Sequence, residues 1–386
     1  MRQWAIVRRL RLNPDLTQQF NLNPIDALRK VAAQQGGLAG FRVGGKQAYL
    51  VSSPELIHQV LYELKLPKRQ GRPGATELLG QGVMTSEGEL NRLQRARLRP
   101  LFGRLCQAGW RPAIEEEAQR LADSWQDGQH LNSLGEFGKL SLAVACRCLL
   151  GRRLKQEPIL LQALEDCLEL RASPAEIRRR LDPICRELLQ SARGPLVEIL
   201  LDAPISDSLR HDEVITMLLG AHETTAAALA WSMRLLALHP QHQPGREVVA
   251  EAMRLYPPGW MIARQLDQSL ELAGRPLEAP ATVLMSPMVT HYLPHLWPRP
   301  EEFHPERFRT PPDRCSYFPF GGGERICLGE RLAWVESEVA LPLIAGQWSL
   351  QPLAAGPVTL RAGASLRPAC GLPARVARAY LPAKTT

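Results

Sequence analysis

Apolar positions recur at helical spacing through most of the chain, whereas short alternating stretches lie towards its two ends. The pattern predicts helices over 91–126, 133–151, 157–171 and 174–193. Strands are predicted at 36–51, which holds two around a Gly-Gly turn, and near 262–264, 269–272 and 282–286. Ser53-Pro54-Glu55 opens a helix to about Leu61, residues 66–90 are rich in loops, and 347–383 has the alternation of small β-hairpins. The fold class predicted is therefore mainly α with small peripheral β-sheets.

The longest predicted helix covers 207–239. Ser206 or Asp207 can cap its start, and Pro240 ends it, which gives about 45 Å of helix at about 1.5 Å per residue. Its middle is apolar on nearly all sides, as in a buried helix, yet it contains Gly220-Ala-His-Glu-Thr-Thr225. Buried Glu and Thr side chains need polar partners. Either they face a small solvent channel, or they take part in chemistry.

Length and composition restrict the possible classes. The 386 residues, 45% of them hydrophobic, allow a large single domain or two ordinary ones, and we predict one domain over 1–386. The eight cysteines have no regular spacing that predicts a disulfide framework, which favours a reducing cytoplasm. The net charge of +8 fits nucleic acid, an anionic membrane or an acidic protein. Because no nucleic-acid motif accompanies the dispersed arginines, we prefer an acidic protein partner.

The N-terminal residues show neither a signal peptide nor an apolar run near 20 residues, so no integral membrane span is predicted. Apolar Trp4, Ile6 and Val7 alternate with arginines. This stretch is predicted to be a docked basic helix, with a helix on the membrane surface as the alternative.

The glycine-rich segment Phe318–Ala333 carries the strongest chemical signal. It places Cys327 between a loop and the start of a probable helix, where backbone N–H groups stabilise a thiolate. Gly329 lets a flat group approach closely, and Arg325 can reach an anionic group beside the cysteine. These features together predict axial ligation of a haem, with Arg325 on a propionate. The alternative is a glycine-rich turn that carries a structural free cysteine.

This segment resembles the cysteine-ligand loop of the cytochrome P-450 family, Phe-Gly-x-Gly-x-Arg-x-Cys-x-Gly. The positions that match are Phe320, Gly321, Gly323, Arg325, Cys327 and Gly329. The resemblance implies the cytochrome P-450 fold with a long central helix over haem b. It also implies that Cys327 is the iron ligand and that Phe320, Gly321 and Gly329 lie against the haem.

The long helix resembles the distal helix of the same family, whose pattern is Ala/Gly-Gly-x-Asp/Glu-Thr. Gly220, Glu223 and Thr224 match it, and Ala221 stands where Gly is more usual. The resemblance implies that Ala221 lies over the haem and that the catalytic residues are Thr224 and Glu223, which deliver protons during oxygen activation.

Three further segments resemble family motifs. Glu251-Ala-Met-Arg254 and the later Arg307 imply a buried charged network of structural rather than catalytic role. Arg264 matches a propionate-binding arginine. Arg95 matches another, although Asn91 stands where the family usually has Trp or His. Two segments are shorter than usual, residues 151–206 and the connection before Glu251.

The resemblance implies a soluble haem-thiolate monooxygenase that inserts one atom of O2 into an apolar organic substrate. No flavin or iron–sulfur motif accompanies the chain, so we expect a ferredoxin with its ferredoxin reductase, or a flavodoxin, to donate the electrons. The alternatives are a haem-binding sensor or carrier without turnover, and a peroxide-driven peroxygenase or isomerase.

Overall fold

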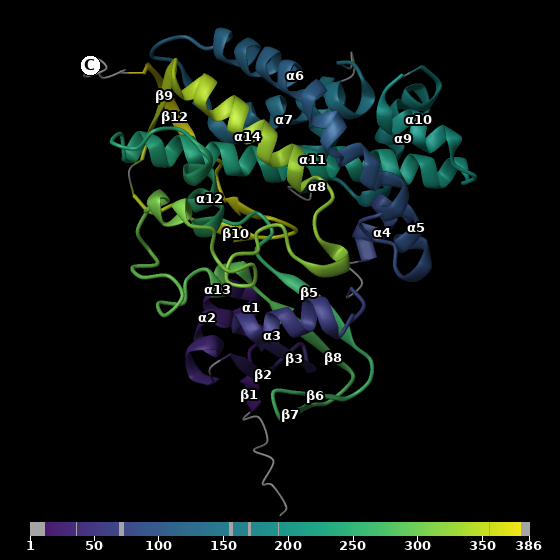
Figure 1. The fold of residues 1–386 in the computed structure, drawn as a ribbon, viewed down its shortest axis with the longest axis vertical. Helices are drawn as coiled ribbons and strands as arrows, with labels where there is room; N and C mark the ends of the chain where they lie inside the picture. The colour runs from purple at the N-terminus through teal and green to yellow at the C-terminus, as the bar shows by residue number, and fades with distance from the viewer. Residues whose placement is uncertain are drawn as a thin grey trace, which may run out of the picture. The chain divides into compact units, whose positions relative to one another are not determined.

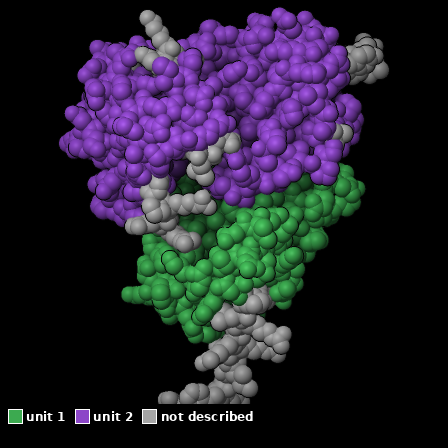
Figure 2. All heavy atoms as spheres, turned by 180° about the vertical axis from the view of Figure 1, so that it is seen from behind, with its two compact units in different colours: residues 1–70, 253–327 green, residues 71–252, 328–386 purple. Residues whose placement is uncertain are grey.

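The computed structural model describes residues 12–35, 37–68, 73–153, 157–168, 171–191, 193–354 and 356–379. The chain forms two compact units (Figure 2). Unit 1 holds residues 1–70 and 253–327, and unit 2 holds residues 71–252 and 328–386. The single domain inferred above stays a prediction. The basic N-terminal helix predicted over the first eleven residues lies outside the described part of the chain.

Unit 1 is built on a five-stranded sheet of strand order β1-β2-β3-β8-β5 (Figure 1). In chain order these strands are β1 (Leu12–Asp15), β2 (Leu38–Val43), β3 (Lys46–Val51), β5 (Ile262–Leu266) and β8 (Ala281–Met285). β2 and β3 pair antiparallel through the predicted Gly44-Gly45 turn, where both glycines have positive φ. β3 pairs parallel with β8, with Val51 opposite Met285. Residues distant in sequence therefore form one sheet.

Short helices and a hairpin complete unit 1. They are α1 (Thr17–Leu22), α2 (Pro24–Gln35), α3 (Pro54–His58), the π-helix η1 (Gln59–Glu63), β6 (Leu270–Leu272), β7 (Arg275–Leu277), α13 (Pro287–Thr290), and the 3-10 turns η3 (Pro305–Arg309) and η4 (Gly323–Arg325). Ser53 caps α3 as predicted, its Oγ accepting a hydrogen bond from the N–H of Leu56. The core of the unit joins Val51 and Val283 of the sheet to Ile57 of α3 and to Phe318. The sheet thus supports the beginning of the cysteine loop.

Unit 2 is helical and is organised around α11 (Asp207–Leu238), the long buried helix predicted from the sequence (Figure 1). Ser206 caps its start by accepting a hydrogen bond from the N–H of Leu209. α7 (Ser133–Leu150) packs along α11, and α9 (Pro174–Ser191) and α14 (Glu330–Ala345) also contact it. Further helices of the unit are α4 (Pro73–Leu79), α5 (Gly88–Leu98), α6 (Arg104–Asp123), α8 (Glu157–Leu168) and α10 (Pro195–Asp202).

The C-terminal segment forms two small sheets. β9 (Trp348–Pro352) and β12 (Pro373–Arg378) pair antiparallel, and β4 (His130–Asn132) adds to the other side of β12. β10 (Leu360–Ala362) and β11 (Leu366–Pro368) make the predicted kind of hairpin. The predicted fold class, mainly α with small peripheral sheets, is confirmed.

One helix prediction needs correction. The helix predicted over 91–126 is interrupted by the 3-10 turn η2 (Arg99–Phe102) and by Gly103, because Pro100 lacks a backbone donor and Gly103 is extended. The region 66–90, predicted to be rich in loops, also contains the short helix α4, and α10 was not predicted at all. α12 (Arg246–Leu255) begins only eight residues after α11 ends, so the predicted short connection is confirmed. Among the described helices, none is long and apolar enough to cross a membrane.

Candidate functional site

The cysteine loop of unit 1 is held by its own backbone. The N–H of Cys327 donates to the carbonyl of Phe320 at 3.0 Å, and the N–H of Gly321 donates to the carbonyl of Phe318 at 2.9 Å. Gly321 and Gly323 have φ of +73° and +66°, which side chains with a Cβ rarely adopt. The loop leaves Cys327 exposed and Phe320 half-buried. The thiol is therefore accessible to a ligand.

Close packing explains why this loop needs glycine. A Cβ on Gly323 would lie 1.9 Å from the carbonyl oxygen of Leu61, and a Cβ on Gly322 would lie 2.7 Å from the hydroxyl of Tyr62. Both neighbours belong to η1. A Cβ on Gly321 would meet only Ile262 of β5, at 3.5 Å. The loop thus rests against η1 and β5, and this contact fixes its position within unit 1.

His291 anchors the start of the loop, a role that sequence reasoning missed. Its Nε2 accepts a hydrogen bond from the N–H of Phe318 at 3.2 Å, and its Nδ1 lies 3.3 Å from the carbonyl of Arg254. Burial lowers the pKa of His291 to about 3, so the ring is neutral and can accept this bond. No sequence signal pairs residue 291 with residue 318. The ring also stacks on Tyr317, and this contact supports the same loop.

The arginines of the predicted charged network bind backbone carbonyls. Arg254 is fully buried and donates to the carbonyls of His291 and Pro300 at 2.9 and 2.8 Å. Arg307 donates to the carbonyl of Pro298 at 3.0 Å. Both therefore hold the segment that precedes the cysteine loop, and this fits the structural role predicted for them. Glu251 is also fully buried.

Three arginines were predicted to bind haem propionates. Arg325 is half-buried in η4 within the cysteine loop, and Arg264 is buried on β5, two residues from Ile262. The structure therefore brings these two to the same part of unit 1. Arg95 is half-buried on α5 in unit 2. Asn91 is occupied elsewhere, because its amide donates to the carbonyl of Val83 at 2.8 Å.

The motif on α11 presents its two predicted catalytic residues in different directions. Successive helical residues are about 100° apart around the axis. Thr224 is exposed and its hydroxyl donates to the carbonyl of Gly220 at 3.2 Å, whereas Glu223 is buried. The carboxylate of Glu223 makes an ion pair with Arg367 of β11, Oε1 to Nε, at 2.9 Å. Ala221, which follows Gly220 on the same helix, is half-buried.

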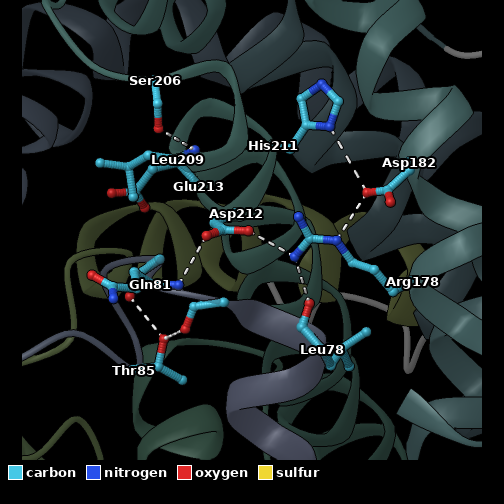
Figure 3. A network of polar contacts seen from close by, with 12 residues as sticks. Leu78, Gln81, Thr85, Arg178, Asp182, Ser206, Leu209, His211, Asp212 and Glu213 are labelled. Atoms are coloured by element: carbon cyan, nitrogen blue, oxygen red, sulfur yellow. Dashed lines mark hydrogen bonds and ion pairs between the residues drawn. The ribbon is translucent and has the colours of Figure 1, made fainter. Parts of the chain in front are cut away.

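A second polar network ties α11 to the loop after α4 (Figure 3). Asp212 accepts from the N–H of Gln81 at 2.9 Å and makes a 2.7 Å ion pair with Arg178 of α9. Glu213, 1% exposed, accepts from the N–H of Val83 at 3.0 Å. Burial raises the pKa of Glu213 to about 7. Sequence reasoning did not find these two adjacent acids, which hold residues 81–83 against the helix.

The chain matches known proteins along most of its length. The cytochrome P450 family model matches residues 16–175 and 246–366. The chain belongs to the cytochrome P450 family. It is 30% identical over 398 aligned residues to a cyclooctatin synthase of Streptomyces melanosporofaciens, with 86% of each chain covered.

Other relatives agree with this assignment. A cyclooctat-9-en-7-ol 5-monooxygenase of the same species is 29% identical, covering 86% of both chains. A pentalenene oxygenase of Streptomyces avermitilis is 26% identical, covering 91% of this chain and 90% of its own. The solved structure of a 6-coordinated cytochrome P450 from Thermus thermophilus superposes with a TM-score of 0.81 at 28% identity, covering 96% of this chain and 100% of that chain. The protein is thus a cytochrome P450 monooxygenase and a haem b protein.

Among the described cysteines of this P450, one in the glycine-rich loop has the exposure that haem ligation needs. Burial raises the pKa of Cys148 and Cys185 to about 12 and that of Cys315 to about 11, and Cys146 is fully buried. Such thiols stay protonated and cannot reach an iron. Of the exposed described cysteines, Cys327 lies in the glycine loop, whereas Cys370 does not. The residues present therefore fit the cofactor, and Cys327 stays the predicted ligand.

Proposed function

We propose that this P450 inserts one oxygen atom into an apolar terpenoid hydrocarbon or alcohol. The relatives support this substrate class, since two of them are named for acting on pentalenene and on cyclooctat-9-en-7-ol. The overall reaction joins substrate R–H, O2, two electrons and two protons to give R–OH and water. We further propose that a ferredoxin with its reductase, or a flavodoxin, supplies the electrons in the cytoplasm.

The observation that carries the proposal is the exposed Cys327 thiol in a loop that only glycines allow. Bound haem supplies the activation of oxygen. Cys327 would hold it through its thiolate, with Phe320, Gly321 and Gly329 around it. Arg325, Arg264 and Arg95 would hold its propionates. Arginine suits this role because its planar fork of donors matches a carboxylate.

The residues of α11 would manage protons. Thr224 lies on an accessible face and can donate a hydrogen bond to a group beside Ala221. Glu223 is the ionisable member of the pair and would replace the proton that Thr224 gives up. Arg367 pairs with the Glu223 carboxylate and so fixes its position.

Ligation is tested by the difference spectrum of the reduced protein with carbon monoxide. The parent should show the red-shifted Soret band of thiolate ligation, and Cys327→Ser should lose it. Cys315→Ser is the matched control, because that thiol is buried in the core of the same unit and should leave the band in place. A normal band in Cys327→Ser would refute the assignment.

Substrate class and electron source are tested together by turnover. Pentalenene and cyclooctat-9-en-7-ol should give substrate-binding spectra and hydroxylated products with a surrogate ferredoxin and reductase. Fatty acids of similar carbon number serve as the control substrates for this class assignment. Product with peroxide alone, and none with the ferredoxin system, would favour the peroxygenase. Spectral binding without product under any condition would favour a sensor or carrier.

A further inference from the structure

A cavity of about 120 Å³ lies within unit 2 beside the carboxylate of Glu223. Its lining residues come from α7, α11, the end of β4 and the segment after β10, together with Glu165 of α8 and Arg171. We call it the His222 cavity, since His222 of α11 also lines it. A space of this size with polar walls has room for several water molecules.

His222 is the side chain whose state needs explanation. It is 4% exposed, and among the described residues neither of its ring nitrogens has a hydrogen-bond partner. Burial, with a smaller effect of the Arg367 charge, lowers the pKa of His222 to about 4. The ring is therefore neutral near pH 7, with one nitrogen as donor and the other as acceptor. Buried polar atoms are nearly always paired, so this ring calls for partners within the cavity.

The opposing helix packs tightly against one edge of this ring. Gly138 of α7 faces it, and a Cβ on that residue would lie 3.0 Å from His222 Nε2. No bulky side chain is therefore placed between α7 and the imidazole. Partners for the ring nitrogens must therefore reach them from the cavity, which His222 lines.

Glu223 lines this cavity and immediately precedes Thr224 in the chain. Its carboxylate lines the cavity and pairs with Arg367, which lines it too. Thr224, about 100° further around the helix, is exposed on another face. A proton that reaches Thr224 through Glu223 must first reach the carboxylate on the cavity side. The charged groups that line the cavity with His222 are Glu223, Arg367, Glu165 and Arg171.

We propose that the His222 cavity is a water-filled proton inlet, in which His222 positions the waters that protonate Glu223. The inference rests on the proposed monooxygenase reaction, which consumes two protons for each oxygen atom inserted. Each proton comes from bulk water and passes along the cavity waters to the Glu223 carboxylate, which passes it on and returns to its ionised form. His222 donates and accepts hydrogen bonds but is not consumed, so it is a positioning residue.

The first test does not depend on activity. A high-resolution crystal structure of the haem-loaded protein should show ordered waters within hydrogen-bond distance of both His222 ring nitrogens. It should also show them connected to the Glu223 carboxylate. A dry cavity, in a map that shows ordered water elsewhere in the interior, would overturn the proposal.

The second test uses His222→Phe, which keeps a ring of similar shape but removes both nitrogens. We expect its substrate-binding spectrum and KM to stay as in the parent. Product formed per reducing equivalent should fall about threefold, with a matching rise in released peroxide, and the solvent isotope effect on kcat should increase. His222→Gln keeps a donor and an acceptor and should recover most of the coupling. His130→Phe, an exposed position on β4, is the control and should behave as the parent.

These outcomes separate the inlet from the substrate proposal. Parent-like coupling and isotope effect in a folded His222→Phe would overturn the inlet. If His222→Phe loses coupling with an unchanged isotope effect, and His222→Gln does not recover the coupling, the role of His222 is packing only. That result would also overturn the inlet proposal. Absence of product from the parent would contradict the proposed substrate class, while the crystallographic test would still decide the cavity.

Discussion

Replacing Glu213 with Gln should remove a pH-dependent part of the stability of this P450. The Glu213 carboxyl is 1% exposed and accepts a hydrogen bond from the N–H of Val83. Gln is nearly isosteric and its carbonyl oxygen can accept the same bond. The substitution therefore removes the titrating group and leaves the packing and the loop contact in place.

The magnitude follows from the pKa of Glu213. Burial raises it from the ordinary 4.5 to about 7, against the opposing effect of the Val83 N–H. At about 1.4 kcal/mol for each pH unit, this difference corresponds to about 3 kcal/mol. The folded protein holds the proton more tightly than the unfolded chain. The contribution of Glu213 is therefore fully present below pH 4.5 and is lost as the pH rises through about 7.

The assay is urea unfolding of the parent and of Glu213→Gln at several pH values between about 5 and 8, followed by far-UV circular dichroism. The free energy of unfolding of the parent, minus that of the variant, should fall by about 2.5 kcal/mol over this range, because other titrating groups cancel in the difference. Glu198→Gln is the control, since that carboxylate is exposed on α10, and its difference should be flat. A flat or rising difference for Glu213→Gln would refute the reasoning.

Three further outcomes test other contacts. Arg178→Met should lower the free energy of unfolding by about 3 kcal/mol, because it leaves the buried carboxylate of Asp212 without its ion-pair partner. Arg186→Met, on the exposed face of α9, is the control and should have little effect. Equal losses of the two variants in urea unfolding would contradict this expectation. His291→Phe should cost about 2 kcal/mol near pH 7 by leaving a buried backbone N–H unpaired. The difference in free energy of unfolding between parent and variant should shrink as the pH falls from 6.5 towards 5, because the lowered pKa of His291 makes the parent lose stability over this range. A difference that grows as the pH falls would contradict this expectation. Thr224→Ala should keep substrate binding but release peroxide in place of product, and unchanged coupling in a turnover assay would remove its proton role.

The sequence by itself determined the features whose causes are local. The ends of α11 follow from the Ser206 cap and from Pro240, and its burial follows from an apolar surface on all sides. The cysteine loop was predicted because glycine spacing, Arg325 and Cys327 lie within ten residues. The Gly44-Gly45 turn was predicted for the same reason. In each case the decisive residues are neighbours in the chain, so their pattern survives without tertiary information.

Tertiary structure alone decided which distant groups meet. Nothing in the pattern pairs His291 with Phe318, Asp212 with Arg178, or Glu223 with Arg367. The break at Pro100 and Gly103 was open to sequence reasoning but was outweighed by the helical pattern around it. Buried polar side chains select their partners by distance and desolvation, and these depend on how separate helices and strands pack. The candidate site residues were therefore predictable from the sequence, whereas the residues that contact them and hold them in place were not.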